Sequence, residues 1–118
     1  MKQIDLPQSS ISQLTSILKS YPEIDKAVVF GSRAIGNAKP GSDVDLALSG
    51  KKLTSQTVSR IQNYLEEETL LPYFFDCIHL ESIQNKNLLD HIKTYGITLY
   101  LSPHQGCFQD NTCPKETN

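Results

Sequence analysis

The chain has 118 residues, with 11 Lys and Arg against 13 Asp and Glu, so its formal net charge at pH 7 is -2. This length predicts one domain with a modest hydrophobic core, and the slightly acidic balance argues against a binding surface for long nucleic acid. No stretch approaches the ~18 consecutive apolar residues of a membrane span, and the first residues lack the apolar run of a signal peptide, so we expect a soluble, cytoplasmic protein without membrane contact.

The first predicted element is an amphipathic helix. Gln8-Ser9-Ser10 offers an N-cap, and apolar residues then recur at helical spacing up to Tyr21-Pro22. These apolar residues are Ile11, Leu14, Ile17 and Leu18. Their spacing predicts one helix face that packs against a sheet.

A short buried strand is predicted over residues 27–30, and it stops at Gly31-Ser32. Its residues are β-branched or aromatic, apart from Ala27, as expected for a buried strand. Because Gly31 has no Cβ, a ligand can approach its main chain. The Ser32 hydroxyl and the amides of a following helical turn can bind phosphate oxygens, and Arg33 can add a charged fork. This turn therefore predicts a phosphate site.

Two aspartates follow in a segment that alternates like a strand, residues 43–48. Alternation places Asp43 and Asp45 on one face, about 7 Å apart if each residue rises about 3.3 Å. Like charges at this spacing repel each other unless a cation lies between them. A pair of Mg²⁺ ions is the usual clamp for phosphoryl and nucleotidyl transfer. The segment therefore predicts a metal-binding pair of carboxylates close to the phosphate turn.

The next predicted helix begins after Thr54 or Ser55 and crosses over to a third strand. Its apolar face is formed by Val58, Ile61, Tyr64 and Leu65. Its acidic end, Glu66-Glu67-Glu68, is interpreted as a solvated face rather than a metal cluster, because consecutive helical positions point in different directions.

The third predicted strand, residues 73–80, carries Asp76 among apolar neighbours. Strand interiors are depleted in Asp, and a buried carboxylate is costly unless a charge or a metal pairs with it. Because neighbouring strands lie about 4.8 Å apart, Asp76 can lie beside Asp43 and Asp45 and complete a triad. The alternative is an Asp at a solvent-facing strand position. His79 falls on the opposite face by alternation and is left out of the predicted site.

The last predicted elements are a helix after residues 85–87, capped by Gly96, and a closing edge strand over residues 97–101. We therefore expect one domain over residues 1–101 and a flexible polar tail over residues 102–118. The three cysteines are expected as free thiols. His104, Cys107 and Cys113 in the tail lack a fourth ligand and a standard spacing, so they make a weak zinc site.

These elements predict a small α/β (α+β) fold in which helices cover a mixed sheet. The connection through residues 31–42 is short for a full parallel crossover, whereas residues 49–72 are long enough for one.

The run GSRAIGNAKPGSDVDL resembles the signature of the DNA polymerase β nucleotidyltransferase superfamily, and within it most resembles the minimal nucleotidyltransferase (MNT) group. The resemblance covers residues 8–101. It implies the polymerase β-like fold and the transfer of a nucleoside monophosphate from an NTP to an acceptor. On that basis Gly31 and Ser32 hold the β and γ phosphates, with Arg33 as a helper. Asp43 and Asp45 bind two Mg²⁺ ions, while Asp76 binds the catalytic ion and helps to activate the acceptor hydroxyl.

The MNT resemblance also implies a partner. Proteins of this group occur with a HEPN-domain toxin and serve as the antitoxin, in some cases by attaching AMP from ATP to a tyrosine of the toxin. A nucleotidyltransferase with a small-molecule acceptor, similar to the aminoglycoside-modifying enzymes, is an alternative, although those enzymes carry an additional domain. A second alternative is a nucleotide-binding module that neutralises a HEPN protein without catalysis. An RNA-terminal transferase is disfavoured by the weak basic charge.

Overall fold

The structure is a computed structural model, and it describes residues 3–39 and 41–103. Within these residues, four strands and four α-helices follow one another in the order expected from the sequence, with one 3₁₀ turn. The elements are α1 (Gln8–Lys19), β1 (Lys26–Phe30), α2 (Ser32–Ile35), β2 (Val44–Ser49), α3 (Ser55–Glu67), β3 (Phe75–His79), the turn η1 (Leu80–Ser82), α4 (Lys86–Tyr95) and β4 (Ile97–Leu101).

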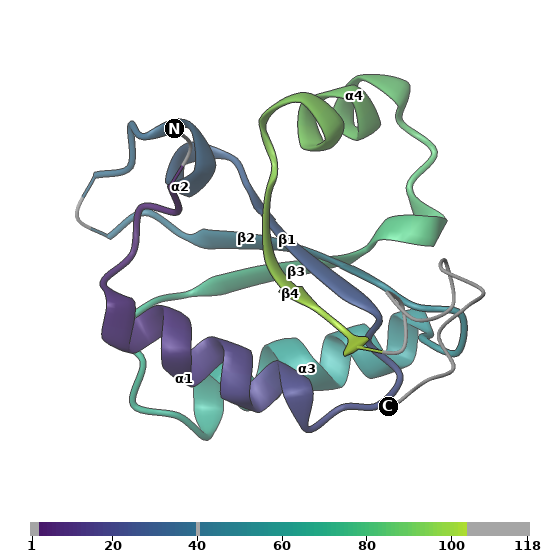
Figure 1. The fold of residues 1–118 in the computed structure, drawn as a ribbon, viewed down its shortest axis with the longest axis horizontal. Coiled ribbons are helices and arrows are strands. Elements are labelled where there is room, and N and C mark those ends of the chain that lie inside the picture. Colours follow the sequence, from purple (N-terminus) through teal and green to yellow (C-terminus); the bar gives the residue numbers. More distant parts are fainter. Residues whose placement is uncertain (1–2, 40, 104–118) are drawn as a thin grey trace.

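The strands form one mixed sheet in the order β3-β2-β1-β4. β1 pairs antiparallel with both β2 and β4, whereas β2 and β3 are parallel. The parallel pair is joined through α3, because parallel neighbours need a long crossover. This arrangement confirms the predicted mixed sheet and the edge position of β4. It also brings the end of β1 and the starts of β2 and β3 to one edge of the sheet, on the left in Figure 1.

Helices cover the two faces of the sheet unequally. Figure 1 shows α1 and α3 side by side on one face and α4 on the other. The face under α1 and α3 holds the main core, whose fully buried residues include Leu14, Leu18, Val29, Leu46, Leu48, Ile61 and Leu65. The α4 face holds a much smaller cluster, Val28, Phe30, Ala47 and Ile92. Because each fully buried aliphatic or aromatic side chain contributes about 1.5–3 kcal/mol, the α1 and α3 layer supplies most of the hydrophobic stabilisation.

At two of the three long helices, the N-cap residue is the one predicted from the sequence. The Thr54 side chain accepts a hydrogen bond from Thr57 N, and the Asn85 side chain accepts one from Leu88 N, as N-caps do. α1 differs, because it begins directly after Pro7 without a side-chain cap. Ser10, predicted as part of that cap, is buried inside the helix, where its hydroxyl lies 3.1 Å from Tyr73 Oη. The predicted cap at α1 is therefore wrong.

Two smaller expectations also need correction. Tyr64, predicted on the apolar face of α3, is exposed, whereas Val58, Ile61 and Leu65 of that face are buried. Gly96 ends α4 as predicted, but with φ -64 rather than a left-handed conformation. A Cβ at Gly96 would collide with Ile92 O and Val28 Cγ1, so the glycine permits close approach of α4 to β1.

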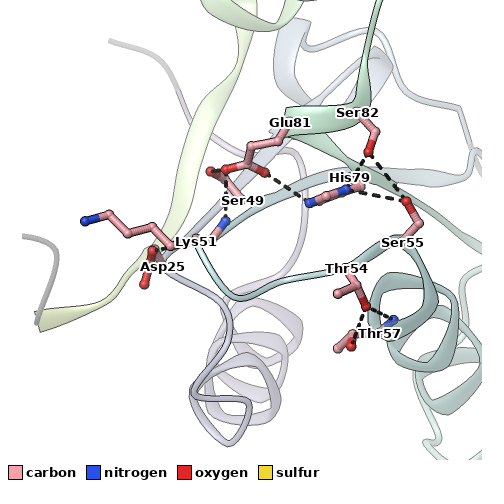
Figure 2. A network of polar contacts seen from close by, with 10 residues as sticks. Asp25, Ser49, Lys51, Thr54, Ser55, Thr57, His79, Glu81 and Ser82 are labelled. Carbon is pink, nitrogen blue, oxygen red and sulfur yellow. Dashed lines mark hydrogen bonds and ion pairs between the residues drawn. The ribbon is translucent and has the colours of Figure 1, made fainter.

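A polar network joins the ends of β2 and β3 that lie away from α2 (Figure 2). His79 Nδ1 lies 2.6 Å from Ser82 Oγ, and its Nε2 lies within ion-pair distance, 3.3 Å, of Glu81 Oε1. The other oxygen of Glu81 accepts hydrogen bonds from Ser49 Oγ and Gly50 N. These contacts tie η1 to β2, so His79 has structural partners at the opposite end of the sheet from Asp45.

The first residue after β4 still contacts the domain. Ser102 is buried, and its N–H donates a hydrogen bond to Asp25 O at 2.8 Å, so the folded region includes this residue. Residues 104–118 of the predicted tail, with His104, Cys107 and Cys113, lie outside the described residues. No helix in residues 3–39 and 41–103 is long and apolar enough to cross a membrane.

Candidate active site

The turn after β1 has a backbone that only glycine adopts without strain. Gly31 has φ 75 and ψ -151, a conformation that is essentially confined to glycine. A Cβ at this position would also collide with the Asp45 carboxylate. α2 begins directly after it, and the N–H groups of Ala34 and Ile35 donate to Gly31 O. Gly31 thus lets the chain turn sharply while a carboxylate from the neighbouring strand lies against the main chain.

The sheet register aligns Asp45 with both of its neighbours. Asp45 is opposite Phe30 on β1 and beside Asp76 on β3. In paired strands, residues in register point to the same face. Asp45 therefore lies between the glycine turn and Asp76 on the sheet face that α4 partly covers.

The charges of the two other predicted carboxylates act on the central one, Asp45. Burial raises the pKa of Asp45, and the negative charges of Asp76 and Asp43 raise it further. His91 opposes these effects and lowers the Asp45 pKa. Asp43 and Asp76 are exposed, and Asp43 precedes β2 rather than lying within it. The site therefore carries negative charge that its described surroundings compensate only in part.

The residue types at this edge fit a hard divalent cation. Mg²⁺ is bound in proteins through one or two carboxylates together with substrate phosphates, and carboxylates that repel one another gain from a shared cation. Among residues 3–39 and 41–103, however, no three or more His, Cys, Asp and Glu side chains form a ready-made metal cluster. The predicted triad is thus an acidic edge with suitable oxygen donors and not a closed metal cage.

Arg33 is placed differently from the sequence-based expectation. Its guanidinium is buried, donates to Asp5 O at 3.0 Å and to Ser42 O at 2.9 Å, and lies 5.1 Å from the centre of the Tyr73 ring. These contacts use Nη1 and Nη2 within the protein, and Nε is buried without a hydrogen-bond partner among the described residues, so the guanidinium faces backbone carbonyls rather than solvent. Because Ser42 immediately precedes Asp43, we assign Arg33 a positioning role for the segment that carries this aspartate.

His91 is a residue of this site that the sequence did not reveal. Its ring packs edge-on against Phe30 at 6.3 Å and lies 5.2 Å from the ring of Tyr95. Among the described residues, His91 is also the one group that lowers the pKa of Asp45. In the sequence His91 is an isolated polar residue in an amphipathic helix, so only the packing of α4 over β1 identifies it.

A glycine-serine turn beside paired aspartates on a mixed sheet is the arrangement of a nucleotidyl-transferring enzyme. The sequence matches the family described as "Polymerase beta, Nucleotidyltransferase" over residues 12–105. The chain belongs to this polymerase β nucleotidyltransferase family. No curated protein matches the sequence.

Solved structures share the fold at low sequence identity. A toxin-antitoxin complex with AMP-PNP matches with a TM-score of 0.67 and 21% identity, covering 86% of this chain and 82% of the other. A tri-AMPylated HEPN toxin of Shewanella oneidensis in complex with an MNT antitoxin matches at 0.63 and 20%, covering 89% and 76%. The toxin-antitoxin pair MntA-HepT matches at 0.62 and 19%, covering 90% and 83%. The likeness establishes an MNT-like nucleotidyltransferase fold.

Proposed function

We propose that this protein transfers AMP from ATP to a tyrosine hydroxyl of a HEPN-domain partner and thereby acts as the antitoxin of a two-component system. The observation that carries the proposal is the position of Asp45 between the Gly31 turn and Asp76. The positive charge near Asp45 does not balance the negative charges of the carboxylates, which raise its pKa. A triphosphate bound with Mg²⁺ would supply the missing positive charge and place its reacting phosphorus at the carboxylates.

In the proposed reaction the acceptor oxygen attacks the α-phosphorus of ATP. The bond between the α-phosphorus and the oxygen that bridges to the β-phosphorus breaks, and pyrophosphate leaves. Gly31 and Ser32 bind the β and γ phosphates through the main chain and the Ser32 hydroxyl. Asp76 takes the proton of the acceptor hydroxyl on a carboxylate oxygen.

Asp43, Asp45 and Asp76 are the proposed ligands for two Mg²⁺ ions. When bound, these ions offset the charge of the triphosphate and of the leaving pyrophosphate. Arg33 is assigned no phosphate contact here, because its guanidinium has partners within the protein.

Two comparisons support this choice of donor and acceptor. One structural match contains AMP-PNP, a nucleotide analogue of ATP, and another contains a HEPN toxin that carries AMP. We extend these properties to the present chain as part of the proposal. The proposed reaction is a cytoplasmic one, where ATP and a toxin would both be available. The proposed catalytic unit is residues 1–101, with residues 102–118 outside the reaction.

The test is intact-mass spectrometry of a candidate HEPN-domain partner from the same source, after incubation with ATP, Mg²⁺ and this protein. We expect a gain of one or more AMP units on the partner, and no gain with Asp43→Asn/Asp45→Asn. Asp90→Asn, an exposed carboxylate of α4, is the matched control and should transfer normally. Equal complex formation by wild type and double variant without any mass gain would overturn the enzymatic proposal and leave a nucleotide-binding partner protein.

A further inference from the structure

The connection between α3 and β3 presents two large apolar side chains to solvent. Leu70 is 97% exposed and Phe74 is 70% exposed, more than any other large hydrophobic residue in the described part of the chain. Single exposed apolar residues are common on protein surfaces, whereas a group of them marks an interaction site. Two such residues in one short connection therefore indicate a surface that binds another molecule.

The exposed charges along this part of the chain are acidic, while the guanidinium that packs against Tyr73, that of Arg33, is buried. Residues 61–80 contain four acidic residues and neither Lys nor Arg. Glu67 and Glu68 are exposed, and neither forms an ion pair within residues 3–39 and 41–103. Unpaired charge of one sign attracts a surface of the opposite sign and repels a like one. A partner for this connection is therefore expected to be basic around an apolar contact.

The same connection adjoins the candidate active site. Phe74 O accepts a hydrogen bond from Val44 N at 2.9 Å, so Phe74 is bonded to the residue between the two aspartates. Phe74 also lines a pocket of about 370 Å³ together with Tyr73 and Gly41. In Figure 1 the connection lies at the left, below α2 and the starts of β2 and β3. Phe74 also precedes Asp76 by two residues, so a protein bound here would lie beside the segments that carry Asp45 and Asp76.

We propose that the 70–74 surface, defined as Leu70 and Phe74 with the flanking Glu67 and Glu68, is the docking site of the protein that accepts AMP. The acceptor presents an apolar socket for Phe74 and Leu70, rimmed by Lys or Arg. This inference rests on the proposed function, because it takes the acceptor to be a protein. The apolar contact supplies affinity, while the acidic rim orients and accelerates the encounter.

The test is binding of the purified HEPN-domain partner by isothermal titration calorimetry at low and high salt. Leu70→Ser/Phe74→Ser is expected to weaken binding about tenfold or more, because truncated apolar anchors dominate such interfaces. Both side chains are exposed, so the melting temperature should not change. Leu101→Ser, which truncates an exposed leucine on β4, is the matched control and should bind as wild type does.

The charge of the surface is tested separately. Glu67→Lys/Glu68→Lys is expected to slow association and to remove most of its salt dependence, whereas Asp90→Lys on α4 should change neither. AMP transfer at saturating partner should be retained by both double variants, with only the partner concentration for half-maximal rate increased.

The outcomes separate this inference from the proposed function. Wild-type binding that the Leu70 and Phe74 substitutions leave unchanged would overturn the docking site while AMP transfer stands. Wild-type binding that both double variants weaken, without any AMP transfer, would support the docking site and overturn the enzymatic proposal. A wild-type protein that does not bind the partner would overturn both.

Discussion

Gly31 and Asp45 lie so close together that any side chain at position 31 would overlap the Asp45 carboxylate. Gly31 directly follows β1, whose last residue, Phe30, pairs with Asp45 on the antiparallel strand β2. The main chain of the turn proposed to bind phosphate therefore lies directly against the central carboxylate, and a side chain at position 31 would displace Asp45. This coupling leads to the first prediction.

Gly31→Ala should displace Asp45 and strain the turn, because both the backbone conformation and the space require glycine. We expect AMP transfer to fall by about 100-fold or more, as misplaced reacting groups cost that much, and unfolding to become about 1–3 kcal/mol easier. Gly36→Ala is the control. Gly36 also has a positive φ, 85, but open space around it, so only the stability loss is expected. Equal activity loss in both variants, measured beside urea unfolding, would contradict this account.

Asp45→Asn should stabilise the ligand-free protein at pH 7. Burial and the charges of Asp76 and Asp43 raise the pKa of Asp45, so the folded state binds its proton more tightly than the unfolded chain does. Stability from this group is therefore gained as the pH falls through the raised pKa and is complete below the unfolded value. The carboxylate is partly exposed and screened, so the difference at pH 7 should be on the order of 0.5 kcal/mol.

The sign of this effect can be measured by thermal unfolding of both proteins from pH 7 to pH 4. The advantage of Asp45→Asn should shrink as the pH falls, since wild-type Asp45 then becomes neutral as well. Mg²⁺ with AMP-PNP should raise the melting temperature of the wild type and have little effect on the variant, because ligands stabilise only the state they bind. A variant that is less stable than wild type at pH 7 would show that Asp45 has a structural partner.

Arg33→Met should reduce stability and activity together. The substitution removes two charge-assisted hydrogen bonds to backbone carbonyls and the contact with Tyr73, which should cost about 2–4 kcal/mol. Activity should fall because the segment before Asp43 loses its anchor. An unchanged melting temperature with a higher KM for ATP would instead identify Arg33 as a phosphate ligand, as the sequence first suggested.

Cys77 should react with thiol reagents only when the protein unfolds. Burial raises the pKa of its thiol to about 12, with smaller contributions from the charges of Asp76 and Glu66, so almost no thiolate is present at pH 8. The measurement uses a Cys107→Ser/Cys113→Ser background and compares labelling with and without urea. Rapid labelling of the folded protein would show that β3 opens at the edge of the sheet.

Much of the fold could be predicted from the sequence because its patterns are local. The alternation after Asp43, the glycine-serine turn and the lengths of the connections were enough to predict the mixed sheet and to place Asp45 beside Asp76. Helix caps at Thr54 and Asn85 were equally readable, since each depends on residues three positions apart.

The remaining features depend on contacts between distant segments. Ser10 resembles an N-cap residue in the sequence, but it lies within α1, where its hydroxyl contacts Tyr73, 63 residues away. Arg33 follows the phosphate turn in sequence, yet its guanidinium bonds to Asp5 and Ser42. His91 approaches Asp45 only because α4 packs over β1. No pattern in a single stretch of sequence contains this information.

The pairing of Phe30 with Asp45 has a consequence for how such a domain can diversify. The distance from Gly31 to Asp45 is set by hydrogen bonds between β1 and β2 and not by the length of chain that joins them. The joining segment between α2 and β2 can therefore lengthen or shorten over generations while the reaction geometry stays constant. The hydrogen-bonded pairing of β1 with β2, and not the spacing in the sequence motif, therefore fixes where Asp45 lies relative to Gly31.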